Sequence, residues 1–180
     1  NVVTPFTTVS CGGGLQFGSH YFRCWNRHGH GAMRLHEAIV QSCDVYFYQV
    51  GNRLGVDGIA EYSRRFGLGV PTGIALEHEK PGIIPDTPWK RKRFNQPWYP
   101  GETLSVAIGQ GYVVATPLQM AVMLSTVVNG GVRYRPQYVK RIESADGTPI
   151  WEMQPEVMAD AKLKKSTVEQ LKSAMRDVVM

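Results

Sequence analysis

The chain has 180 residues, of which 43% are hydrophobic and 10% aromatic, so it can bury one sizeable core. Its net charge of +5 is modest, and neither an apolar run approaching the ~18 residues of a membrane span nor a secretory signal is present. Because the chain opens on Asn1 in mid-sequence style and stops at Met180 inside a helical pattern, we expect it to be part of a longer protein.

The first third of the chain combines short extended segments with three predicted helices. Gly18 and Ser19 separate two apolar segments and predict a hairpin. Helices are predicted over 33–41, from Asp44 to a stop at Gly55, and over 57–66. The apolar positions expected to be buried on the second and third of these are Tyr46, Phe47, Val50 and Leu54, then Ile59, Tyr62 and Phe66.

The remainder of the chain begins with a proline-rich stretch. Residues 67–102 show no sustained periodicity and predict a long loop, either an ordered rim beside a cleft or a surface loop without a ligand role. A helix is predicted from Thr116, where Thr116 and Gln119 form a capping box, to Asn129. A hairpin about Asp146-Gly147 and a terminal helix opened by a second capping box over 166–169 follow.

A basic cluster over 90–93 lies next to Trp89, Phe94 and Trp98. Basic residues beside aromatic rings are typical of surfaces that bind single-stranded nucleic acids. Because the cluster lies in a proline-rich loop with no nucleic-acid module around it, we expect no nucleic-acid partner. A solvated loop and a contact with an anionic wall glycan are the two interpretations that remain.

The three cysteines and one histidine follow the spacing C-x12-C-x5-H-x12-C, as Cys11, Cys24, His30 and Cys43. An odd number of cysteines argues against a framework built only from disulfides. Cys3His is a common closed zinc set, and thiolates favour zinc over magnesium or calcium, so the pattern predicts a structural zinc site. A Cys11–Cys24 disulfide with a spare thiol, or inert buried thiols, are the alternatives. Other possible ligands are His20, His28 and His36, the last expected on a helix surface.

Ser42 and Asp44 lie at the junction of the first two predicted helices. Asp44 is expected to cap the second helix, because aspartate favours the N-cap position. Such a cap would hold the preceding hydroxyl of Ser42 rigidly. A metal on Cys43 would link this junction to the cysteine cluster.

The order of three motifs carries a resemblance to a known family. Ser42-x-Asp44, then Gly109-Gln110-Gly111, then Thr116-Pro117-Leu118-Gln119-x-Ala121 resembles the transpeptidase domain of class B penicillin-binding proteins. Gly29-His30-Gly31, the run over 44–49 and Phe66-Gly67-Leu68-Gly69 are similar to the elongation-specific subgroup. The resemblance covers essentially the whole chain.

The resemblance implies an α+β fold like that of penicillin-binding proteins and serine β-lactamases, of which residues 1–180 would be a mostly helical part with small hairpins. The family's Ser-x-x-Lys and Lys-[Ser/Thr]-Gly motifs are absent from this chain and are expected before Asn1 and after Met180. Without the central sheet, apolar faces of the helices from Met33 and Thr116 are expected to be exposed.

The implied activity is that of a peptidoglycan D,D-transpeptidase that β-lactams inhibit. Ser42 would relay a proton between the motif lysine and the leaving amine, and Asp44 would orient that lysine or the substrate amide. Many relatives carry asparagine there, so the carboxylate should favour a protonated lysine. The implied zinc site lies beside the active site, with Cys11 and Cys24 where relatives carry aspartates.

The implied partners are the peptidoglycan stem peptide, β-lactam antibiotics and membrane proteins of the elongation complex, including a glycosyltransferase. The implied location is the periplasmic face of the bacterial inner membrane. Two other functions stay open at this point, a β-lactam-binding sensor domain of similar fold and a zinc-stabilised structural domain without catalysis. The flanking sequence would distinguish these from the enzyme.

Overall fold

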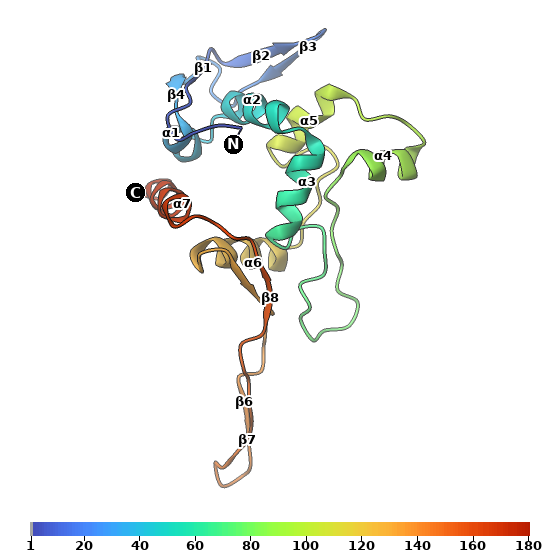
Figure 1. Cartoon of the computed structure of the whole chain (residues 1–180), viewed down its shortest axis with the longest axis vertical. Helices are drawn as coiled ribbons and strands as arrows, with labels where there is room; N and C mark the ends of the chain where they lie inside the picture. The colour runs from blue at the N-terminus through green and yellow to red at the C-terminus, as the bar shows by residue number, and fades with distance from the viewer. Residues whose placement is uncertain (1) are drawn as a thin grey trace.

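Short strands, a run of helices, a second set of short strands and a last helix follow one another along the chain, in a computed structural model that describes residues 2–180 (Figure 1). The strands pair antiparallel, two by two: β1 (Val9–Cys11) with β4 (Gly31–Met33), β2 (Gly14–Phe17) with β3 (His20–Arg23), β5 (Val132–Tyr134) with β8 (Val157–Asp160), and β6 (Arg141–Glu143) with β7 (Pro149–Glu152). The helices are α1 (Leu35–Val40), α2 (Asp44–Leu54), α3 (Val56–Arg65), α4 (Thr87–Phe94), α5 (Pro100–Ala107), α6 (Pro117–Val128) and α7 (Lys165–Asp177). The expected α+β class is confirmed. Among residues 2–180, no helix is long and apolar enough to cross a membrane.

Helix α2 is the centre of the main core and packs against α1, α3, α5 and β1. Gly51 lets α2 approach α5 closely, because a Cβ at this position would lie 2.3 Å from the Cβ of Ala107. The core residues come from the β1–β4 sheet, the residue after β3, the start of α2 and the helices α1, α2 and α5: Val9, Cys11, Cys24, Met33, Ala38, Cys43, Val45, Tyr46, Tyr48 and Leu104. The three cysteines are therefore part of the core.

The structure confirms most of the predicted elements in the first third and corrects their details. The hairpin at Gly18-Ser19 is β2–β3, and α2 ends at Gly55 as predicted. Helix α1 begins two residues later than expected because Met33 pairs with Val9 in the β1–β4 sheet. The buried stripe of α3 was predicted wrongly, since Tyr62 is 47% exposed and Ala60 is buried in its place.

The prediction of a long loop over residues 67–102 is wrong in part, because the segment contains α4 and the start of α5. The carboxylate of Asp86 accepts a hydrogen bond from the amide of Trp89 at 2.7 Å and so caps α4. Asp86 also pairs with Arg64 of α3 at 2.7 Å, which fixes α4 against the preceding helix.

Later in the chain, the capping box of Thr116 and Gln119 at the start of α6 and the hairpin β6–β7 are confirmed. The second capping box is wrong: α7 begins at Lys165, after an N-cap at Lys164 that makes no side-chain cap. Helix α7 packs on α1, so the last helix of the chain returns to its first quarter, whereas β6–β7 projects away from the body (Figure 1).

Lys90 was expected in a solvated basic cluster, and this prediction is wrong because its side chain is only 2% exposed. Its ammonium group pairs with the carboxylate of Glu102 and donates to the hydroxyl of Tyr112 at 3.0 Å. The next three residues, Arg91, Lys92 and Arg93, are exposed as expected. Four aromatic rings lie with their centroids 4.8–6.0 Å from the ammonium nitrogen: Phe94, Trp98, Tyr99 and Tyr112.

The Lys90–Glu102 pair joins α4 to the N-terminus of α5. Glu102 also accepts a hydrogen bond from the amide of Tyr99 at 3.0 Å, which closes the first turn of α5. The carboxylate raises the pKa of Lys90. Burial pushes the pKa of Glu102 upward, but the hydrogen bonds from Lys90, the amide of Tyr99 and the hydroxyl of Tyr112, with the charge of Lys90, together outweigh burial and lower it overall. The pair is therefore ionised across the neutral range.

Replacing Lys90 with methionine should lower the melting temperature by about 5 °C or more, because Glu102 loses its cation in a largely dehydrated place. The folded-state pKa of Glu102 is depressed, so this contribution is present at neutral pH and is lost as the pH falls through the folded pKa. The difference in melting temperature should shrink below about pH 4. Lys92→Met, on the exposed side of the same helix, is the matched control. Equal melting temperatures of the two variants at neutral pH would contradict the assignment.

One face of α6 exposes an apolar stripe at helical spacing. Met120, Leu124 and Val128 are 43%, 43% and 53% exposed, as expected for the helix that begins at Thr116. The same expectation is wrong for α1, where Leu35 and Ile39 are half-buried and α7 packs alongside. The 180-residue chain thus carries an uncovered apolar strip on α6.

We expect the isolated chain to associate through this strip. Sedimentation velocity should show concentration-dependent oligomers, and Leu124→Lys should shift the distribution towards monomer. Leu76→Lys changes a comparably exposed leucine in a loop and should have no such effect. A sharp monomeric unfolding transition at high temperature for the isolated chain would count against the prediction.

Candidate functional site

Ser42 occupies a strained turn between α1 and α2. The amide of Ser42 donates to the carbonyl of Ile39 at 3.2 Å, and that of Cys43 donates to the carbonyl of Ala38 at 2.9 Å. This is the Schellman pattern, in which the residue at the position of Ser42 adopts a left-handed conformation and is usually glycine. Ser42 has φ of 49° and an exposed side chain. A hydroxyl is thus held at the surface at a backbone cost of about 1 kcal/mol.

Asp44 is the first residue of α2, and Cys43 is the N-cap, so the predicted capping role of Asp44 is off by one residue. Its Oδ2 accepts a hydrogen bond from the backbone amide of Trp25 at 2.8 Å. The indole of Trp25 donates to the carbonyl of Gln41 at 2.9 Å. Trp25 therefore bonds to the chain on both sides of Ser42. Sequence reasoning missed this role, for which the only signal was the position of Trp25 directly after Cys24.

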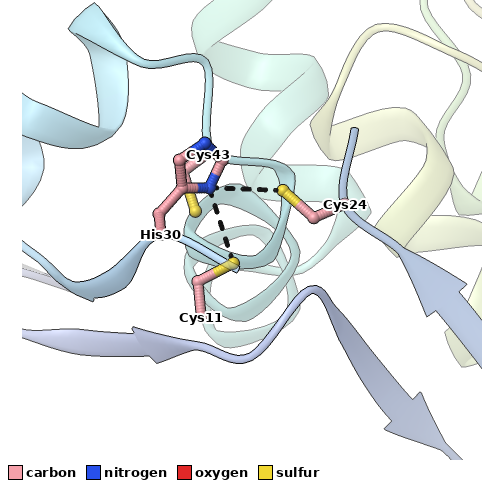
Figure 2. A group of neighbouring side chains, drawn as sticks. All are labelled: Cys11, Cys24, His30 and Cys43. Atoms are coloured by element: carbon pink, nitrogen blue, oxygen red, sulfur yellow. Dashed lines mark hydrogen bonds between the residues drawn. The ribbon is translucent and has the colours of Figure 1, made fainter. Parts of the chain in front are cut away.

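The four residues of the predicted metal set converge on one point (Figure 2). Cys11 ends β1, Cys24 follows β3, His30 precedes β4 and Cys43 caps α2. Their candidate ligand atoms all lie within 4.8 Å of one another. Nδ1 of His30 lies 3.6 Å from Sγ of Cys11 and 3.5 Å from Sγ of Cys24. The sequence spacing alone had grouped these residues correctly.

The distances fit a tetrahedral ion at the centre of the group. Bonds of about 2.3 Å to sulfur and about 2.0–2.1 Å to nitrogen would separate the two atoms by about 3.5 Å. Without an ion, Nδ1 can form a hydrogen bond with only one of the two thiols that contact it. The Cys11–Cys24 disulfide alternative is wrong, because all three cysteines are free. The alternative ligands His20, His28 and His36 lie exposed outside the group, and His36 pairs instead with Asp177 at 3.1 Å.

Two glycines bring the ligand-bearing loops together. Gly13 and Gly29 have φ of 92° and 82°, and a Cβ on either would lie 2.3 Å from a backbone carbonyl oxygen of the facing loop. The amide of Cys24 donates to the carbonyl of Gly13 at 2.9 Å, and the side chain of Asn26 donates to the carbonyl of Gly29 at 2.9 Å. The backbone therefore places the ligands without help from a disulfide.

The thiols differ in acidity because their surroundings differ. Burial raises the pKa of Cys11, but hydrogen bonds from the amide of Gly13 and from His30 outweigh it and lower the pKa to about 7. Burial raises the pKa of Cys43 to about 12, with the amide of Tyr46 opposing the shift. Since Cys43 stays protonated near neutral pH by itself, a cation is needed to make it a thiolate.

The second ring nitrogen of His30 has a different environment. Among the described residues, Nε2 is buried without a hydrogen-bond partner. The ring instead meets Trp25 edge to face, with centroids 5.3 Å apart. The orientation of His30 thus depends on its Nδ1 contacts with the thiols and on packing against Trp25.

Comparison with known proteins gives consistent matches. The family model described as penicillin binding protein transpeptidase domain matches residues 1–180. The peptidoglycan D,D-transpeptidase MrdA of Haemophilus influenzae is 44% identical over 147 residues, which are 81% of this chain and 23% of that protein.

Two solved structures show the same fold. The structure of Pseudomonas aeruginosa PBP2 in complex with WCK 5153 has a TM-score of 0.86 at 39% identity, and the match covers 99% of this chain and 38% of that one. The complex of PBP2 and MreC from Helicobacter pylori has a TM-score of 0.80 at 34% identity, covering 98% of this chain and 30% of that one. The chain spans about a quarter of the length of the curated relatives it matches. Since the family model matches along its whole length, the chain belongs to the penicillin-binding protein transpeptidase family.

Proposed function

We propose that this chain is the middle of the transpeptidase domain of an elongation-type peptidoglycan D,D-transpeptidase, between the Ser-x-x-Lys and Lys-[Ser/Thr]-Gly motifs. The observation that carries the proposal is the strained left-handed backbone of Ser42, which presents a hydroxyl where a helix would normally end in glycine. The family membership supports the same assignment, because the family model for the transpeptidase domain matches residues 1–180.

In this proposal Ser42 is a proton relay. The serine of the Ser-x-x-Lys motif attacks the carbonyl carbon of the penultimate D-alanine of a stem peptide, and the terminal D-alanine leaves as an amine. The hydroxyl of Ser42 takes a proton from the motif lysine and gives its own proton to that amine. Asp44 orients the lysine or the substrate amide with one carboxylate oxygen, while the other holds the amide of Trp25.

We propose a structural zinc site at Cys11, Cys24, His30 and Cys43. The support is the convergence of three buried thiols and Nδ1 of His30 at distances that suit a tetrahedral ion. A bound zinc would supply cross-linking between β1, the end of β3 and the N-terminus of α2. Because Cys43 directly follows Ser42, the cross-link would fix the turn that presents the hydroxyl.

The proposed partners follow from the relatives. A Helicobacter pylori relative forms a complex with MreC, and a further similar structure is described as a peptidoglycan synthase complex that coordinates polymerisation and cross-linking. We propose that the whole protein works with membrane proteins of the elongation complex, including a glycosyltransferase, and binds stem peptides and β-lactam antibiotics. Its proposed location is the periplasmic face of the inner membrane.

Two substitutions at Ser42 distinguish the effect of its hydroxyl on acylation from the effect of its strained backbone on stability. Ser42→Gly should raise the free energy of unfolding by about 1 kcal/mol, because glycine adopts the left-handed conformation freely. Ser42→Ala keeps the unfavourable backbone and should not gain stability. Both variants of the full-length protein should be acylated by a fluorescent penicillin at least about 10-fold more slowly, the low end of a general acid–base contribution. Acylation of both variants at the wild-type rate would exclude the relay role.

The zinc proposal predicts one zinc per chain in native mass spectrometry of protein purified under reducing conditions. Removal with a chelator should lower the melting temperature, and added zinc should restore it. Cys43→Ser should abolish zinc binding and slow acylation, although Cys43 itself touches no substrate in this proposal. His28→Ala, which removes an exposed histidine near the site, should retain the metal. A metal-free wild-type protein of unchanged stability would contradict a structural zinc.

A further inference from the structure

The same cluster holds three free thiols that are 0–2% exposed and lie within 4.8 Å of one another and of His30. Three thiols in one site can serve as metal ligands in the reduced state and form a disulfide when oxidised. We propose that Cys11 and Cys24 are an oxidation-sensitive pair, which a peroxide-class oxidant joins in a disulfide with release of the zinc ion. This inference rests on the proposed zinc site and concerns its regulation.

Backbone contacts favour Cys11 and Cys24 as the reacting pair. Both sulfurs contact the same atom, Nδ1 of His30, at 3.6 and 3.5 Å, so both already point to the centre of the cluster. The amide of Cys24 bonds to the carbonyl of Gly13, two residues from Cys11, which ties the two segments together. Gly12 and Gly13 follow Cys11, so the chain beside it carries no side chains that would resist a small backbone adjustment.

Cys43 is less able to move. Its amide is bonded to the carbonyl of Ala38 as part of the turn that ends α1, and it caps α2. Its sulfur is fully buried among the core residues. A disulfide to Cys43 would have to displace the junction of two packed helices, whereas one between Cys11 and Cys24 displaces only the end of β1 and the segment that follows β3.

The oxidant can reach the cluster through local opening. The β1–β4 sheet has only three residue pairs, and the loops that flank it contain the exposed residues Gly12, Trp25 and His28. A pairing this short, flanked by exposed loops, can open locally at a lower free energy than that of global unfolding. Such local opening is enough for a small oxidant such as hydrogen peroxide to reach the thiols.

The reaction balances with a single oxidant molecule. One thiolate attacks an oxygen of hydrogen peroxide, the O–O bond breaks, and a sulfenic acid and a hydroxide ion form. The second thiolate attacks the sulfenic sulfur, the S–S bond forms and a second hydroxide ion leaves. The sulfur pair loses two electrons, which the peroxide oxygens gain. Only His30 and Cys43 then remain as ligands, too few to hold zinc in a closed tetrahedral site.

Loss of the ion would release the link between the β1 and β3 segments and the turn that presents Ser42. The cluster therefore links the conformation of this turn to the oxidation state of its thiols. The turn is fixed while the thiols are reduced and bind the metal, and it is released once Cys11 and Cys24 form a disulfide. A thiol reductant and zinc together would restore the metal-bound cluster.

The test uses the full-length, zinc-loaded protein treated with hydrogen peroxide. A chromogenic zinc chelator reports release, and alkylation followed by peptide mass spectrometry reports the disulfide. We expect one zinc released per chain, in step with a Cys11–Cys24 linked peptide, and rebinding after dithiothreitol and zinc are added. Retention of zinc, or release without any Cys11–Cys24 peptide, would overturn the proposal.

Two matched variants test the choice of pair, since aspartate is also a zinc ligand. Cys43→Asp keeps the reactive pair and should release zinc at the wild-type rate, whereas Cys24→Asp removes it and should release zinc at least about 10-fold more slowly. Equal rates in both variants would refute the pairing. If either variant lacks zinc, the linked peptide in peroxide-treated wild type decides the pairing by itself. A reduced wild-type protein without zinc would refute the proposed zinc site, and with it the release step, even where the disulfide still forms.

Discussion

Cys43 joins the two helices of the site to the strands around them. Its amide completes the turn that ends α1, its position caps α2, and its sulfur lies in the cluster with Cys11, Cys24 and His30. A single buried residue thereby connects the turn after α1, the start of α2 and the group of candidate metal ligands. The strained conformation of the neighbouring Ser42 persists because Cys43 is fixed in this way and the carbonyl of Gln41 on the other side accepts the indole hydrogen bond of Trp25.

The surrounding packing explains how that junction is supported. Helix α2 runs from the junction into the core, where Gly51 allows α5 to approach it closely. The first turn of α5 is held in turn by Glu102 and the enclosed ammonium of Lys90. The charge of Lys90, which the sequence places in a basic cluster, thus forms a buried ion pair that connects α4 to α5.

The cluster and the hydroxyl are connected by more than Cys43. Trp25, the residue after Cys24, donates its amide to Asp44 and its indole to the carbonyl of Gln41, on the two sides of Ser42. A change in the Cys24 loop would therefore reach Ser42 by two routes, through the cluster and through Trp25. This shared support is why the proposed metal, the proposed relay and their redox sensitivity belong to one structural unit.

The sequence by itself determined the elements with local signals and the grouping of the three cysteines with one histidine. The capping box at Thr116, the turn at Gly18-Ser19 and the stop at Gly55 are encoded by neighbouring residues, so they were predicted correctly. The cysteine–histidine spacing also grouped four residues that the structure brings within 4.8 Å of one another, because thiols and imidazole in such a pattern are typical zinc ligands.

Only the tertiary structure decided which sides are buried and how the site is held. The burial of Lys90 depends on aromatic rings and a carboxylate brought together from separate segments, which no local pattern encodes. Likewise, the exposure of Tyr62 depends on which neighbours α3 meets. The left-handed turn at Ser42 follows from the packing of α1 and α2 around Cys43, and a propensity for glycine at that position would have argued against it.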